Sequence, residues 1–210
     1  MADIELVGNI AKETLTAGAG AWLWERACRV AGNAERIASM VEKSNANVPI
    51  DKFCLTAAGY FSDSGLVYKR KKDKPQFVDI DPKEIAELSI MMVNEKLGQV
   101  LTAQRLSSVN NIIGESQDRF TKLVEAMVLS DAVTLDEMGP TGVMSQYRKF
   151  VVEGKGAGEF VQNFKRKMEY KYFDARLKEG FKFDEVRTIA AERFEMAKQF
   201  VFALDSEGGG

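Results

Sequence analysis

The chain of 210 residues contains no histidine, and this absence excludes more chemistry than any other feature of the sequence. Histidine is the commonest general base near neutral pH and a common ligand of transition metals. Ser-His-Asp and Cys-His catalysis are therefore excluded, as are zinc sites that need an imidazole. The remaining options are paired carboxylates, lysine or tyrosine chemistry, and Mg²⁺ or Mn²⁺ held by carboxylates.

An excess of charge of either sign is also lacking. The chain has 29 Lys and Arg against 31 Asp and Glu, a formal net charge of -2 at pH 7. Nucleic acid and anionic membranes bind proteins through a surplus of cationic side chains, so neither is expected as the main partner. The most apolar early stretch, residues 17–24, is far shorter than the roughly 18 residues of a membrane span. The first five residues carry two acidic side chains where a secretion signal would be basic, so we expect a cytoplasmic protein.

Cysteine is scarce. Cys28 and Cys54 match neither the C-x-x-C spacing of redox and metal sites nor the dense framework of a small secreted domain. Both lie among apolar residues, so we expect two buried, reduced thiols.

Helical periodicity is abundant. Apolar side chains recur every three or four residues over 22–40, and segment 50–61 is apolar with almost no charge, which is typical of a buried helix. No segment alternates with period two for long enough to form a sheet. Further helices are expected at 82–98, 101–113, 119–132, 143–150, 160–178 and 184–203. We predict an all-α bundle of about eight or nine helices.

One domain is expected, because a chain of this length buries enough surface to form its own core. We place this domain at residues 1–205 and a flexible glycine-rich tail at 206–210. The longest interruption of the helical pattern, 62–81, contains the basic run Lys-Arg-Lys-Lys-Asp-Lys at 69–74. Such a run is usually a solvated loop, and it also suits a phosphate-bearing small ligand or an acidic protein partner. It has no interleaved aromatic side chains, so nucleic-acid binding is not expected.

Carboxylates gather at two places near predicted helix ends. Asp131 and Asp136 flank the end of one helix, and Asp79 and Asp81 precede another. Helix capping and the helix dipole explain each pair, and a Mg²⁺ or Mn²⁺ site is the alternative.

Several segments, in order along the chain, resemble known motifs. Residues 26–30 read Arg-Ala-Cys-Arg-Val, which resembles the motif His-x-x-Arg-Val of the small bacterial-type HD-domain phosphohydrolases. Residues 58–65 read Ala-Gly-Tyr-Phe-Ser-Asp-Ser-Gly, where the family has Ala-Ala-Leu-Leu-His-Asp-Ile-Gly. Residues 131–139 read Asp-Ala-Val-Thr-Leu-Asp-Glu-Met-Gly, where the family has Asp-Ala-Asp-Arg-Leu-Asp-Ala-Ile-Gly. Residues 164–167 and 189–200 resemble the family's Phe-x-x-Lys segment and closing helix.

The resemblance implies the HD-domain fold and the loss of its metal ligands. In the family, two histidines and two aspartates hold one divalent ion, which activates water and polarises a phosphoryl oxygen. The matching positions here are Arg26, Ser62, Asp63 and Val133. One carboxylate does not hold a catalytic ion without help from substrate phosphates, and a guanidinium repels it. The resemblance therefore implies no intact catalytic set and no resident metal.

A positive expectation follows for the remnant carboxylate, Asp63. We expect Arg26 and Asp63 to form an ion pair that takes the place of the metal-ligand bonds and satisfies a carboxylate that is costly to bury. In the alternative, Arg26 points to solvent and Asp63 caps a turn.

Two functions follow from the resemblance. The first is a non-catalytic HD-fold protein, a pseudo-phosphohydrolase that serves as a ligand-binding, regulatory or interaction module. Its candidate anion-binding residues are Arg26, Arg29, Lys69, Arg70, Lys71 and Lys72.

The alternative is a metal-dependent phosphohydrolase of nucleotide-type phosphoesters, with Mg²⁺ or Mn²⁺ on rearranged carboxylates. Those carboxylates would come from Asp63, Asp79, Asp81, Asp131 and Asp136. A homo-oligomer is compatible with either function, and an unrelated helical bundle with chance matches is a third interpretation.

Overall fold

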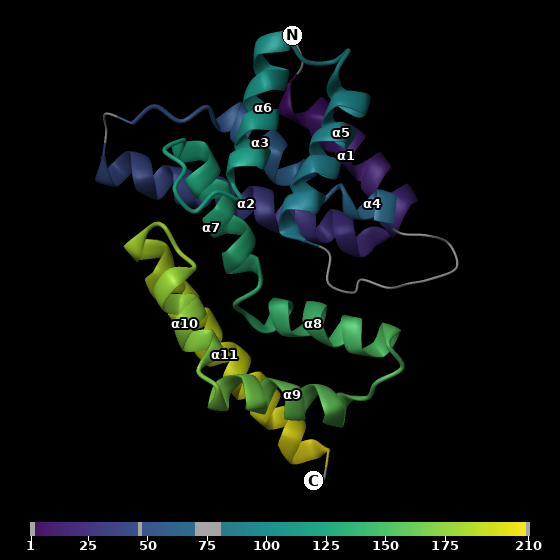
Figure 1. Ribbon diagram of the computed structural model, residues 1–210, viewed down its shortest axis with the longest axis vertical. Coiled ribbons are helices and arrows are strands. Elements are labelled where there is room, and N and C mark those ends of the chain that lie inside the picture. The colour runs from purple at the N-terminus through teal and green to yellow at the C-terminus, as the bar shows by residue number, and fades with distance from the viewer. Residues whose placement is uncertain (1–2, 46–47, 70–80, 209–210) are drawn as a thin grey trace. The chain divides into compact units, whose positions relative to one another are not determined.

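Figure 1 shows the computed structural model, which describes residues 3–45, 48–69 and 81–208. The described residues form ten helices of eight residues or more and a four-residue helix, α4, and they contain no strand. The helices are α1 (Ile4–Ala19), α2 (Ala21–Ser44), α3 (Lys52–Phe61), α4 (Leu66–Lys69), α5 (Pro82–Leu97), α6 (Ala103–Glu115), α7 (Val124–Asp136), α8 (Pro140–Val152), α9 (Ala157–Glu169), α10 (Tyr172–Glu179) and α11 (Asp184–Glu207). The all-α prediction is confirmed, with more helices than the eight or nine expected.

The chain forms two compact units, Met1–Ala132 and Val133–Gly210. The boundary falls within α7, and each unit is described by itself below. The organisation of residues 1–205 as a single domain stays a prediction.

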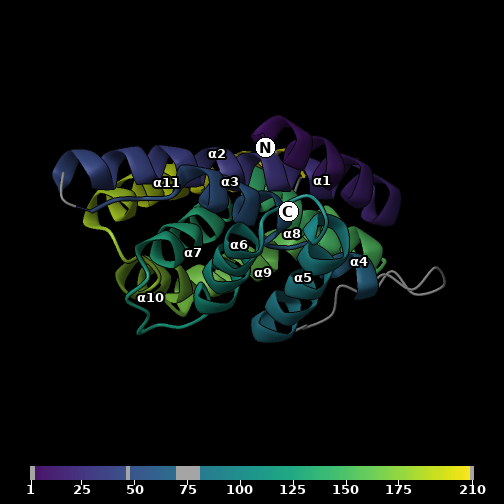
Figure 2. The same cartoon turned by 90° about the horizontal axis from the view of Figure 1, so that it is seen from above.

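The first unit is built around α2 and α3, which pack against each other (Figure 2). α3 is buried over most of its length, as its apolar sequence predicts, and it begins at Lys52 after Asp51, whose carboxylate accepts a hydrogen bond from the Cys54 amide. The two helices approach closely because position 59 is glycine. A Cβ atom there would lie 2.8 Å from the Cα of Ala31 on α2.

Two helices are missing from the sequence prediction, α1 and the four-residue α4, which lies in the predicted interruption 62–81. α1 buries Val7, Ala11, Leu15 and Ala19, a strict spacing of four that places all of them on one face. Gly20 then separates α1 from α2 with φ 92°, in the left-handed region that favours glycine.

The second unit has an aromatic core. Phe160 and Phe164 of α9, Phe173 of α10 and Phe194 of α11 are all nearly inaccessible to solvent. The ring centroids of Phe173 and Phe194 lie 4.6 Å apart, and those of Phe164 and Phe173 lie 4.8 Å apart. Contacts at these distances add to the hydrophobic gain from burying the rings.

Two boundaries in the second unit differ from the prediction. The single helix expected over 160–178 is broken into α9 and α10 by Lys171, whose φ of 53° is left-handed and ends the first helix. α11 continues to Glu207, so residues 206 and 207 are helical rather than part of a tail, and 209–210 lie outside the described residues. Over the described residues, none of the helices combines the length and the apolar character needed to cross a bilayer.

Candidate functional site

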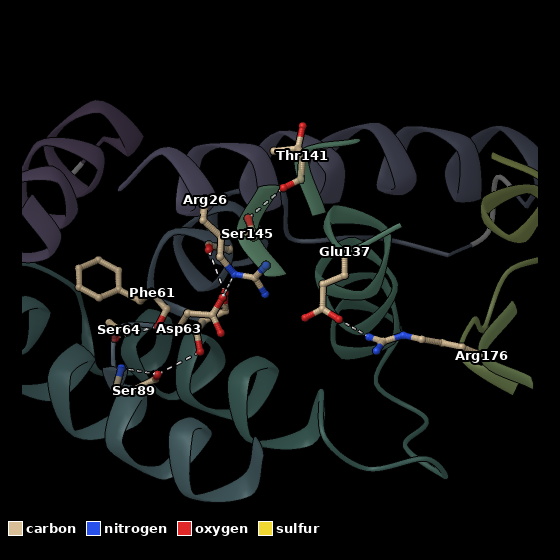
Figure 3. Close-up of polar contacts among 12 residues, drawn as sticks. Arg26, Phe61, Asp63, Ser64, Ser89, Glu137, Thr141, Ser145 and Arg176 are labelled. Carbon is tan, nitrogen blue, oxygen red and sulfur yellow. Dashed lines mark hydrogen bonds and ion pairs between the residues drawn. The ribbon is translucent and has the colours of Figure 1, made fainter. Parts of the chain in front are cut away.

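The first unit contains an ion pair between Arg26 of α2 and Asp63 in the turn after α3 (Figure 3). Arg26 Nε donates to Asp63 Oδ2 over 2.7 Å, across 37 residues of sequence. The two side chains are only 12% and 22% exposed. The predicted ion pair is therefore confirmed, and the alternative in which Arg26 points to solvent is wrong.

The turn that carries Asp63 is fixed to α5 by serine hydroxyls (Figure 3). Ser89 of α5 donates from Oγ to the carbonyl of Ser62 over 3.0 Å and accepts from the amide of Gly65 over 2.8 Å. The Ser64 hydroxyl donates to the carbonyl of Phe61 over 2.8 Å, which satisfies the carboxyl end of α3. Both Ser64 and Ser89 are fully buried, so these bonds hold the turn in one position.

The residues present do not fit the metal site that the resemblance implies. Arg26, which the resemblance matches to one histidine, has its guanidinium bonded to Asp63. Ser62, which it matches to the other histidine, donates from its hydroxyl to the carbonyl of Gly59 over 3.2 Å. Throughout the described ranges, no group of three or more Cys, Asp and Glu side chains is placed to hold a metal ion.

The other candidate carboxylates come from the start of α5 and from α7. Asp81 caps α5 by accepting from the Lys83 amide over 3.0 Å, as the capping explanation predicts. Asp131 and Asp136 are buried side chains of α7, which also carries Val133 at the first residue of the second unit. Asp79 lies outside the described residues.

Only some of the basic residues predicted to bind an anion lie in the described part of the chain. Arg29 lies three residues after Arg26 on α2 and is half-buried. Lys69 ends α4 and forms an ion pair with Glu84 of α5, so its charge is neutralised within the unit. The other anion-binding candidates, Arg70, Lys71 and Lys72, lie outside the described residues.

The two cysteines differ, contrary to the expectation that both are buried. Cys54 is buried, and burial together with its hydrogen bond to Asp51 raises the pKa of its thiol to about 12. Cys28 is exposed, because its position on α2 faces away from the residues that α2 buries. Partial burial raises the pKa of the Cys28 thiol above its ordinary value, so it is not an activated nucleophile.

This difference predicts the stoichiometry of thiol labelling. We expect one thiol, that of Cys28, to react with Ellman's reagent in the native protein, and both to react in urea. Release of two equivalents of the chromophore at the same rate from the native protein would contradict the burial of Cys54, and the Cys28→Ser variant is the control.

In the second unit the structure brings together charged residues that the motif comparison did not single out as a site. Arg176 of α10 forms an ion pair with Glu137, which follows α7 (Figure 3). Nη1 of Arg176 also donates to the hydroxyl of Tyr172 over 3.0 Å. Lys167 of α9 lies 5.4 Å from the centroid of the Tyr172 ring. One feature of the sequence indicates a basic site in this region. Residues 140–178 contain nine Lys and Arg but only four Asp and Glu.

The comparisons with known proteins bear on the fold. No family model matches the chain, and no curated protein matches it. Among solved structures, the crystal structure of Bacillus subtilis YpgQ in complex with ADP matches with a TM-score of 0.63 and 20% sequence identity, covering 99% of this chain and 95% of that chain. The two proteins share a fold.

Proposed function

We propose that this protein is a non-catalytic binding module of the HD-domain type, a pseudo-phosphohydrolase whose ligand carries a phosphate group. The observation that carries the proposal is the ion pair of Arg26 and Asp63. It uses the one carboxylate left at the positions that match the metal site, and it puts a cation at a position where the family has a ligand for a cation.

Two further observations support a phosphate-bearing ligand. Arg29 follows Arg26 by three residues on α2, a spacing that places two guanidinium groups on neighbouring positions of one helix face. Guanidinium groups bind phosphate oxygens in bidentate geometry, and they need no metal to do so. YpgQ, which shares the fold, was solved with ADP, so ADP is the probe to try first.

Calorimetric titration tests this function. ADP is expected to bind in the absence of divalent metal, and the Arg29→Gln variant is expected to weaken binding by about tenfold, because a charged hydrogen-bonding partner of the phosphate is lost. Lys52→Gln is the matched control, because it also removes one positive charge from the first unit, at an exposed ion pair with Glu42. The control is expected to bind ADP as the unaltered protein does.

A phosphate-release assay distinguishes the alternative. We expect no hydrolysis of ADP in the presence of Mg²⁺ or Mn²⁺. Metal-dependent release that disappears in Asp63→Ala would establish a phosphohydrolase with a rearranged carboxylate site. Absence of ADP binding by the unaltered protein would contradict the proposal that ADP is a ligand.

A further inference from the structure

The second unit contains a cationic cluster that the proposed function does not use. Lys149 of α8, Lys167 of α9 and Arg176 of α10 come from three successive helices of this unit. Glu137 is the carboxylate paired with Arg176. These four residues carry three positive charges against one negative charge, a local surplus in a chain whose net charge is only -2.

Lys167 occupies the most unusual position of the cluster. Its side chain is half-buried, and its Nζ lies 3.5 Å from the amide oxygen of Gln146 and 5.4 Å from the centroid of the Tyr172 ring. Neither group carries a full negative charge. The contacts therefore orient the ammonium group without neutralising it.

The pKa of Lys167 is consistent with an ammonium group that no full negative charge neutralises. Burial lowers the pKa of Lys167 below its ordinary value, and the positive charges of Lys149 and Arg176 lower it further. Tyr172 and Glu137 act in the opposite direction but do not restore it. A half-buried ammonium next to two other cations is costly, and an anion bound among the three would remove that cost.

Arg176 supplies a second, oriented donor. Its Nη2 pairs with Glu137 (Figure 3) and its Nη1 donates to the hydroxyl of Tyr172, so two partners restrict the orientation of the guanidinium. The side chain remains 30% exposed, which leaves it accessible to a ligand. A fixed guanidinium loses little entropy when it binds an oxyanion.

We infer that Lys149, Lys167 and Arg176 form a binding site for a phosphate group. A doubly charged phosphate matches the surplus of two positive charges in the cluster, whereas a carboxylate would leave one of them unbalanced. Lys149 is exposed, and Lys167 and Arg176 are half-buried, so the cluster has both a solvent-facing and a partly buried cation to offer a phosphate group. The site lies within α8, α9 and α10, and does not depend on Arg26 or Asp63.

Titration with inorganic phosphate at constant ionic strength tests the site. Lys167→Met keeps the length of the side chain and removes the charge, and it is expected to weaken phosphate binding by about tenfold. The matched control is Lys165→Met on the same helix, since Lys165 is already paired with Asp205 over 2.6 Å. The control is expected to change the affinity by less than about twofold. Equal losses in both variants, or no phosphate binding by the unaltered protein, would overturn the proposal.

A second readout does not depend on how the variant folds. After reductive ¹³C-methylation of the full-length protein, the NMR signal of Lys167 can be followed against pH with and without inorganic phosphate. Bound phosphate is expected to raise the pKa of Lys167 toward the ordinary lysine value, because its charge favours the protonated form. A pKa that stays the same at high phosphate concentration would overturn the proposal.

The same variants separate this site from the proposed function. Phosphate binding that survives in Arg29→Gln and is lost in Lys167→Met supports the site, whatever becomes of the proposed function. Phosphate binding that is lost in Arg29→Gln and kept in Lys167→Met overturns the proposed phosphate site in the second unit but does not contradict the proposed function. Titration with AMP identifies the source of the phosphate: tighter binding than inorganic phosphate indicates a phosphomonoester, equal binding indicates free phosphate, and both support the site.

Discussion

Replacing Arg26 with alanine is expected to lower the free energy of unfolding by about 2–3 kcal/mol, because the Asp63 carboxylate then stays mostly buried without its cation. Loss of one partner of a fully buried pair costs about 3–5 kcal/mol, and the residual exposure of 12% and 22% lets water recover part of this. Urea unfolding followed by circular dichroism measures the change. An unaltered melting temperature in Arg26→Ala would show that the pair contributes nothing.

A double-variant cycle shows whether the effect belongs to the pair. Asp63→Asn alone should also destabilise the protein, and adding Arg26→Met to it should cost less than the sum of the two separate changes. Lys52→Ala breaks a pair in which Lys52 is 52% exposed and Glu42 is 34% exposed, and it should change stability by less than about 1 kcal/mol. Strictly additive effects of the Arg26 and Asp63 substitutions would indicate that the two residues act separately.

Most of the helices could be predicted because a helix that buries one face has apolar residues at every third or fourth position, and this spacing can be seen in the sequence. α5 begins at Pro82 and ends one residue before Gly98, as expected from Pro and Gly at the two ends of a helix. The break at Lys171 could not be foreseen, because lysine gives no turn signal. The break lets Phe164 and Phe173, on either side of it, pack with their ring centroids 4.8 Å apart, a contact between residues that the sequence does not connect. α1 carries its buried residues at a regular spacing of four, so the periodicity that predicts the other helices is present in this segment too.

The candidate sites differ in how far the sequence could reveal them. Arg26 and Asp63 could be paired in advance because the resemblance matches both to ligands of one metal site, which predicts that they lie close together. Opposite charges that lie close together and are partly buried are expected to form an ion pair, as they do. Lys167 ends the short basic run 165–167, but nothing in the sequence connects that run with Arg176, and only the fold of α9 and α10 brings the two residues together. The surplus of Lys and Arg over 140–178 is visible in the sequence, whereas the choice of residues that meet in space is not.

Gly65→Ala is expected to lower the free energy of unfolding by about 2–3 kcal/mol, as overpacking against rigid backbone does. A Cβ atom at this position would lie 2.5 Å from the carbonyl oxygen of Ile85, 2.8 Å from the Cβ of Leu88 and 3.0 Å from the amide nitrogen of Ser89. Two of these three atoms are backbone of α5, so no side-chain rotation relieves the clash. The turn must move away from α5, which also stretches the 2.8 Å hydrogen bond from the Gly65 amide to Ser89.

Gly32→Ala is the matched control for this prediction, since a Cβ atom at position 32 of α2 meets nothing within 4 Å. Alanine is the better helix former, so this change should raise the free energy of unfolding by about 0.5–1 kcal/mol. Opposite signs for the same chemical change would show that Gly65 is required for the close contact with α5. Equal effects would contradict that explanation. The glycine at the end of the Ser-Asp-Ser-Gly turn is thus explained by its packing against α5, with no need of a metal site beside it.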